Sequence, residues 1–118
     1  KRQALVTDAM SATGQPDGDY ILGSLPVKVV DGRARLLAAD GSLGAIAGST
    51  LTMGRAVEFV TSVVGIPLGQ VAVMAATTPA KLHGLNEVGV IEEGHWADLC
   101  LTDAKGHLVR VIHRGEAV

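Results

Sequence analysis

The chain has 118 residues, of which 47% are hydrophobic and only 3% aromatic, and its net charge at pH 7 is −2. That length suffices for one domain with its own core, and a near-neutral charge without a basic stripe argues against nucleic acid and anionic membranes as partners. The single cysteine, Cys100, excludes an internal disulfide, and no apolar run approaches the length of a membrane span, so we expect a cytoplasmic protein.

The first predicted element is a buried strand over residues 4–7 that ends at Asp8. A small and polar stretch, residues 9–14, follows the carboxylate at once. In parallel barrels, catalytic side chains lie in this way at the ends of strands, beside the loops that surround the active site. A carboxylate there can transfer a proton or bind a metal ion. Without such a context, an Asp at a strand end is more often a turn or cap residue. The strand begins almost directly at the first residue, so we interpret the chain as the C-terminal part of something larger.

A small β excursion is predicted next. Strands are expected over residues 20–22, 26–30 and 33–38, with Asp31–Gly32 as a hairpin turn between the second and the third. Asp40–Gly41 repeats the turn chemistry before the Gly-rich run of residues 44–48. Residues 41–44 are also Gly-rich, but they lack the preceding strand and following Lys of a phosphate loop, so nucleotide binding is a weak hypothesis.

Helices should follow. Ser49–Thr50 is a candidate N-cap for a helix over residues 51–64, in which apolar side chains recur every three or four positions. Residues 65–67 should end it. A second helix is expected from residue 68 to about residue 76, and a third, capped by Thr78–Pro79, over residues 80–83, where Gly84 should close it. The chain then changes to predicted strands, over residues 88–91, 99–102 and 108–113.

Four sequence blocks resemble one family. The blocks are residues 5–10 (LVTDAM), 43–53 (LGAIAGSTLTM), 76–80 (ATTPA) and 89–99 (GVIEEGHWADL). The last two resemble the amidohydrolase superfamily in general, and the first two resemble N-acetylglucosamine-6-phosphate deacetylases. The resemblance implies an α/β fold: residues 1–86 would be the C-terminal portion of a (β/α)8 TIM-like metallo-hydrolase barrel. Residues 87–118 would supply strands of the accompanying small β-sandwich domain.

The same resemblance implies an activity and its residues. It implies hydrolysis of the acetamide of N-acetylglucosamine 6-phosphate, a phosphorylated amino sugar, to glucosamine 6-phosphate and acetate, with Asp8 as proton shuttle. Ile46, Ala47 and Gly48 match the segment that contacts the substrate. The family's divalent metal, zinc or iron, is held by a Glu and two His that have no counterpart here, and its residues that grip the sugar phosphate also lie upstream. The 118 residues alone should therefore be inactive.

Other interpretations of the sequence remain open. Its four histidines lack ligand spacing, so no metal site is predicted from them, and Cys100 is most simply a small buried apolar group. A different amidohydrolase, acting on a cyclic amide or another N-acyl sugar, would use the same Asp8. The third interpretation is a non-catalytic module for subunit association, because unpaired strand edges and exposed helix faces favour association. By the resemblance, a homodimer is expected.

Overall fold

The computed structural model describes residues 3–118. They form two compact units: one comprises Thr7–Thr52, and the other comprises Met53–Val118 together with the segment before Thr7. The first unit holds a four-stranded antiparallel sheet, and the second holds helices and a three-stranded antiparallel sheet. The predicted α/β class is confirmed in this form. Among the described residues, no helix has the length and apolar character needed to cross a membrane.

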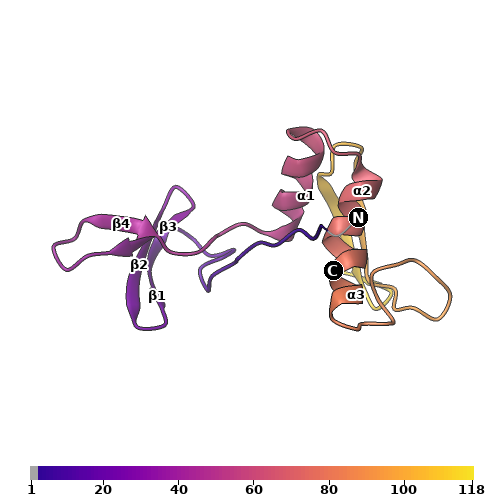
Figure 1. The fold of residues 1–118 in the computed structure, drawn as a ribbon, viewed down its shortest axis with the longest axis horizontal. Helices are drawn as coiled ribbons and strands as arrows, with labels where there is room; N and C mark the ends of the chain where they lie inside the picture. Colours follow the sequence, from indigo (N-terminus) through magenta and orange to yellow (C-terminus); the bar gives the residue numbers. More distant parts are fainter. Residues whose placement is uncertain (1–2) are drawn as a thin grey trace. The chain divides into compact units, whose positions relative to one another are not determined.

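The sheet of the first unit is a meander of β1 (Gly18–Leu22), β2 (Leu25–Val30), β3 (Arg33–Leu37) and β4 (Leu43–Ile46), each paired with the next (Figure 1). The first three strands and the turn between β2 and β3 confirm the predictions. Asp31 has a φ of 51° and Gly32 a φ of 66°, the left-handed pair that a two-residue hairpin turn requires. β4 was not predicted, because its four residues are all exposed and include a glycine, so they show no alternation.

The core of the first unit lies on one face of this sheet. Val27 and Val29 of β2 and Ala34 of β3 point to that face, where Met10, Ala12 and Ala47 complete a buried cluster. Side chains alternate along a strand, so Lys28, Arg33 and Arg35 belong to the opposite face. The loop after Asp8 thus covers one side of the sheet, and the other side carries its cationic residues.

The predicted buried strand over residues 4–7 is wrong for the described structure. These residues pair with no strand among residues 3–118, and Val6 is 76% exposed. The Leu5 N–H donates to the Met74 carbonyl (2.9 Å), and the next strand-like contact is a single parallel bridge between Ala9 and Ser49. A barrel strand is defined by neighbours on both sides, and no described segment supplies them.

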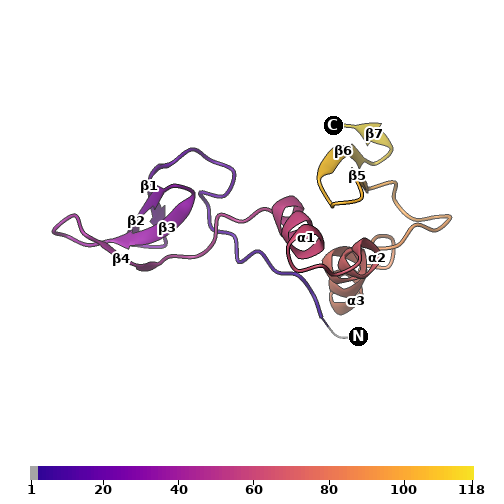
Figure 2. The same cartoon turned by 90° about the horizontal axis from the view of Figure 1, so that it is seen from above.

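The helices of the second unit are α1 (Met53–Ser62) and a continuous column of α2 (Leu68–Ala72), the π-helix η1 (Val73–Thr77) and α3 (Thr78–Leu82) (Figures 1 and 2). Gly65, with a φ of 81°, follows α1 as predicted. The predicted cap is wrong, because α1 begins at Met53. The Ser49 hydroxyl instead accepts the Leu51 N–H at 2.9 Å.

Residues 88–91 form a loop and not the predicted strand. Gly89 has a φ of 87°, outside the strand region, and its carbonyl accepts a hydrogen bond from the Thr77 hydroxyl at 2.6 Å. The backbone of this glycine lies against the column at Ala76, Thr77 and Ala80. Contact with the π-helical turn therefore determines the conformation here, and the alternating Val-Gly-Val-Ile pattern does not.

The second sheet consists of β5 (Leu99–Thr102), β6 (Leu108–His113) and β7 (Glu116–Ala117), which lie side by side (Figure 2). β5 and β6 confirm the predictions, and the two-residue β7 was too short to predict. Asp98 accepts the Arg114 N–H (2.7 Å) and pairs with His113 (3.1 Å). This carboxylate therefore supports the turn between β6 and β7.

His107 connects the turn between β5 and β6 to α1. Its Nδ1 lies 2.6 Å from the Asp103 carboxylate, and its Nε2 lies 3.5 Å from that of Glu58. The hydrogen bond from His107 is the main cause that holds the pKa of Asp103 below its ordinary value of 3.8. The same carboxylate accepts the N–H groups of Lys105 and His107.

Replacing Asp103 by Asn should make unfolding less dependent on pH in the acid range. A carboxylate with a lowered folded-state pKa contributes stability that is complete above the unfolded-state pKa and is lost as pH falls through the folded-state value. We therefore expect the difference in melting temperature between wild type and Asp103→Asn to be largest above about pH 4 and to shrink toward pH 2. Melting curves between pH 2 and 6 check this. A difference that grows as pH falls would contradict it.

Candidate functional site

The backbone of Asp8 is hydrogen-bonded to the segment that follows β4. Its carbonyl accepts the Ser49 N–H at 3.0 Å, and the Met10 N–H donates to the Ser49 carbonyl at 2.9 Å. Asp8 itself has a φ of 50°, in the left-handed region, and its side chain is exposed. Asp8 and the predicted substrate segment, which lies 38 to 40 positions later in the sequence, are thus adjacent in space.

Gly48 is the closest point between the two segments. It has a φ of 82°, and a Cβ placed there would lie 3.2 Å from the Met10 Cβ and 3.7 Å from the Asp8 carbonyl oxygen. A side chain at this position would strain the backbone and press on the loop that begins at Asp8. Glycine is therefore required by the packing itself, beside any role in approaching a ligand.

The other two predicted substrate residues differ in accessibility. Ile46 is 75% exposed, whereas Ala47 is buried in the core and its N–H donates to the Ala34 carbonyl at 3.0 Å. A ligand at this surface can therefore meet the Ile46 side chain and the Gly48 backbone, but not the Ala47 methyl group. The contact roles of all three remain predictions.

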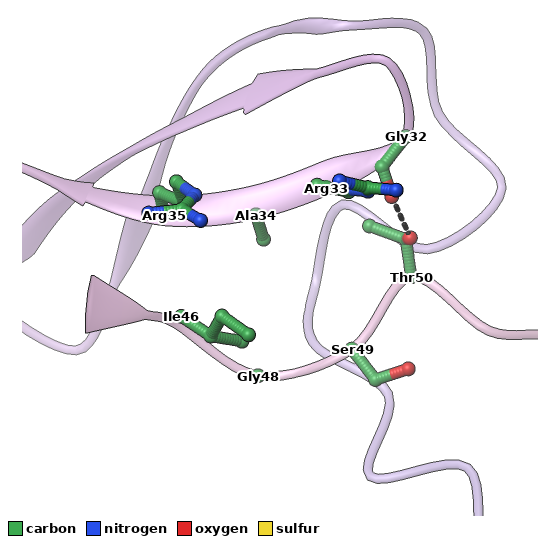
Figure 3. Close-up of a pocket in the computed structure, with 8 residues that line it drawn as sticks. All are labelled: Gly32, Arg33, Ala34, Arg35, Ile46, Gly48, Ser49 and Thr50. Atoms are coloured by element: carbon green, nitrogen blue, oxygen red, sulfur yellow. Dashed lines mark hydrogen bonds between the residues drawn. The ribbon is translucent and has the colours of Figure 1, made fainter. Parts of the chain in front are cut away.

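A shallow groove of about 360 Å³ lies beside this segment (Figure 3). β3 contributes Ala34 and two arginines, Arg33 and Arg35, and the facing wall is formed by Ile46, Gly48, Ser49 and Thr50. The Thr50 hydroxyl donates to the Gly32 carbonyl and closes one end. The arginines were not singled out from the sequence, although the Arg-Ala-Arg alternation within a predicted strand places them on one face.

The described residues do not form a metal site. Within residues 3–118, no three His, Cys, Asp or Glu side chains come together to hold an ion. The rings of His107 and His113 each contact a carboxylate. The Asp40 carboxylate accepts hydrogen bonds from Ser42, which lower the pKa of Asp40. Asp8 belongs to none of these pairs. The donor set present in this part of the chain therefore does not fit a bound divalent metal.

No family model matches the chain, but the known proteins that resemble it are sugar-phosphate deacetylases. An N-acetylglucosamine-6-phosphate deacetylase of Vibrio furnissii is 35% identical over 99% of this chain, and the chain spans 28% of that protein's length. A putative N-acetylgalactosamine-6-phosphate deacetylase of Escherichia coli K12 is 32% identical over 98% of the chain, which covers 67% of it.

Solved structures agree with these relatives. The crystal structure of N-acetylglucosamine-6-phosphate deacetylase from Thermotoga maritima matches 98% of this chain with a TM-score of 0.79 and 40% identity, over 30% of its own length. A mutant deacetylase from Mycobacterium smegmatis, in complex with N-acetyl-D-glucosamine-6-phosphate, matches 97% of the chain with a TM-score of 0.78 and 36% identity. That match again covers 30% of the solved chain.

Proposed function

The chain belongs to the N-acetylglucosamine-6-phosphate deacetylase family, and from this premise we propose that it is part of a longer hydrolase. The longer enzyme would convert N-acetylglucosamine 6-phosphate and water to glucosamine 6-phosphate and acetate. The observation that carries the proposal is the match, over nearly the whole chain, to deacetylases of which it spans about 30%. The backbone junction of Asp8 with Gly48 and Ser49 supports it, since it joins the two family-like segments.

The proposed place of the chain in that enzyme is the end of a (β/α)8 barrel. Residues 1–86 would belong to the barrel and residues 87–118 to the small β domain. In support, Val6 in the segment before Asp8 is 76% exposed, and this segment pairs with no strand among residues 3–118. Further strands of a barrel on either side would bury it.

Asp8 is the proposed proton shuttle of the reaction. One oxygen of its carboxylate would accept a proton from the water whose oxygen attacks the acetyl carbon. The carboxylic acid would then donate that proton to the sugar nitrogen as the C–N bond breaks, because an amide nitrogen leaves poorly unless it is protonated. The exposed carboxylate makes no hydrogen bond or ion pair within residues 3–118, so both oxygens are available for this exchange.

Ile46 and Gly48 are the proposed contacts of this chain with the sugar. The exposed Ile46 side chain offers an apolar surface for a sugar ring, and the Gly48 backbone has no Cβ to keep a ligand away. By resemblance to the family, a divalent ion, zinc or iron, would polarise the acetamide carbonyl. No group of side chains within residues 3–118 could hold this ion.

Two further properties are proposed for the parent enzyme. We expect it to act in the cytoplasm and to form a homodimer. The exposed apolar side chains of the second unit, such as Leu82 (76%) and Ile91 (87%), would be covered either by the rest of the parent fold or by a second subunit.

N-acetylgalactosamine 6-phosphate is the second candidate substrate. It differs from the glucosamine compound only in the orientation of one ring hydroxyl. The observation that favours it is the naming of relatives from Escherichia coli strains and a Shewanella strain as N-acetylgalactosamine-6-phosphate deacetylases, with 32–34% identity to this chain.

An acetate-release assay on the full-length protein that contains this chain tests the proposal. Both 6-phosphates and unphosphorylated N-acetylglucosamine would be supplied, and kcat/KM compared. We expect one 6-phosphate to be preferred over the unphosphorylated sugar by at least roughly 10²-fold, since lost charge-assisted contacts are costly. The preferred 6-phosphate identifies the substrate. Absence of acetate release from all three, in a protein loaded with zinc or iron, would refute a deacetylase.

A further inference from the structure

The position of Asp8 is determined by its backbone. Its carboxylate makes no hydrogen bond or ion pair within residues 3–118, and its φ of 50° belongs to a region that few non-glycine residues adopt. Such a conformation persists only where the surrounding structure holds it. The groups that hold the backbone beside Asp8 therefore decide where the proposed proton shuttle lies.

Two backbone hydrogen bonds join this segment to Ser49. The Ser49 N–H donates to the Asp8 carbonyl at 3.0 Å, and the Ser49 carbonyl accepts the Met10 N–H at 2.9 Å. We call these two bonds the Ser49 junction. Because one residue supplies both the donor and the acceptor, a shift of Ser49 would change both bonds and move the backbone of Asp8.

Thr13 adds a third hydrogen bond to the same residue. Its hydroxyl donates to the Ser49 carbonyl at 3.0 Å, so this oxygen accepts from both Met10 and Thr13. A carbonyl oxygen has two lone pairs and can accept both bonds. The Thr13 N–H donates to the Met10 carbonyl at 3.0 Å, which closes a turn over residues 10–13. Both ends of this turn are therefore bonded to one carbonyl oxygen.

The surroundings of the turn strengthen the effect of the Thr13 bond. Met10 and Ala12 are 7% and 1% exposed and belong to the core cluster of the first unit, and Thr13 is half-buried. A hydrogen bond that is partly shielded from water is stronger than an exposed one, and solvent replaces it less readily. Within residues 3–118, Thr13 supplies the one side-chain hydrogen bond to the Ser49 junction.

We propose that Thr13 is a positioning residue for the deacetylation. Its hydroxyl holds Ser49, and through Ser49 the backbone of Asp8, where the Asp8 carboxylate can exchange its proton with water and the sugar nitrogen. The inference rests on the proposed function, because it concerns the proton transfer assigned to Asp8. A catalytic group displaced by about 1 Å can lose on the order of 10²-fold in rate, whereas contacts that bind the sugar elsewhere are unaffected. Loss of the Thr13 hydroxyl should therefore act on kcat and not on KM.

Three variants of the full-length protein that contains this chain test the inference. Thr13→Val removes the hydroxyl and keeps the shape of the side chain, and Thr13→Ser keeps the hydroxyl and removes the methyl group. The matched control is Thr77→Val. Thr77 is also half-buried and lies in the other unit, and its hydroxyl also donates to a backbone carbonyl, that of Gly89 at 2.6 Å. The control thus removes the same kind of bond without altering the Ser49 junction.

Thr13→Val should lower kcat roughly tenfold or more and change KM less than about threefold. Thr13→Ser should restore kcat to within about threefold of wild type, and Thr77→Val should stay in that range, although it also loses one hydrogen bond. Combined with Asp8→Asn, Thr13→Val should cause no further loss of kcat, because it acts through Asp8. Unchanged kcat in Thr13→Val, an equal loss in Thr77→Val, or a full additional loss in the double variant overturns the proposal.

Amide hydrogen exchange separates this inference from the proposed function. The N–H groups of Met10 and Ser49 are the donors of the Ser49 junction, and Thr13→Val should speed their exchange roughly fivefold or more, whereas Thr77→Val should not. If the wild type releases no acetate, the deacetylase proposal fails, and faster exchange in Thr13→Val still shows that Thr13 holds the backbone of Asp8. Unchanged exchange of both amides overturns the inference, whatever the activity.

Discussion

Replacing Asp8 by Asn should lower kcat of the full-length enzyme by roughly 10²–10⁴-fold, the range that one positioned acid–base group contributes. A carboxamide cannot accept the proton of the attacking water, so both halves of the proposed proton transfer are lost. The substitution also suits the backbone. Asp8 has a φ of 50°, and Asn is among the few residues that adopt this conformation readily, whereas Ala would add strain.

The control for this variant is Asp31→Asn. Asp31 is exposed, belongs to the same unit and has a φ of 51°, so the two substitutions remove the same charge from the same backbone conformation. Activity should survive in Asp31→Asn and fall in Asp8→Asn, with metal content unchanged in both. Asp8→Asn turnover within a factor of about two of wild type would remove Asp8 from the mechanism, since acid–base groups contribute far more.

Local turn chemistry was the most reliable guide to the fold. The Asp31–Gly32 dipeptide predicted a hairpin, and both residues have the positive φ it needs. β5 and β6 were found because apolar runs are bounded by turn residues. In contrast, β4 consists of exposed residues that include a glycine. This strand forms by pairing with β3, and its local sequence pattern does not predict that pairing.

Contacts between distant segments explain the wrong predictions. Residues 88–91 alternate like a strand, but docking of Gly89 onto the helical column sets their backbone. Residues 4–7 have the composition of a buried strand, but no segment within residues 3–118 pairs with them. For the candidate site, the family resemblance selected Asp8 and Gly48, and only the structure shows that the backbones of these two segments are bonded.

Gly89→Ala should destabilise the second unit by about 3 kcal/mol, the sum of two costs. A left-handed conformation costs a non-glycine residue about 1–2 kcal/mol, and overpacking costs a further 1–3 kcal/mol. The added Cβ would lie 2.6 Å from the Ala80 Cβ and 3.1 Å from the Ala76 carbonyl oxygen. These are helical backbone and a rigid methyl group, so neither can move aside without disturbing the π-helical turn.

Gly94→Ala separates the two costs. Gly94 has a φ of 86°, within one degree of Gly89, but nothing lies within 4 Å of its added Cβ. It should therefore show only the backbone cost of about 1–2 kcal/mol. Urea unfolding followed by fluorescence of Trp96, the one tryptophan in the sequence, reports on this unit specifically. Equal unfolding midpoints for the two variants would show that Gly89 is needed for its backbone conformation alone, and that its close packing on the helical column contributes nothing to stability.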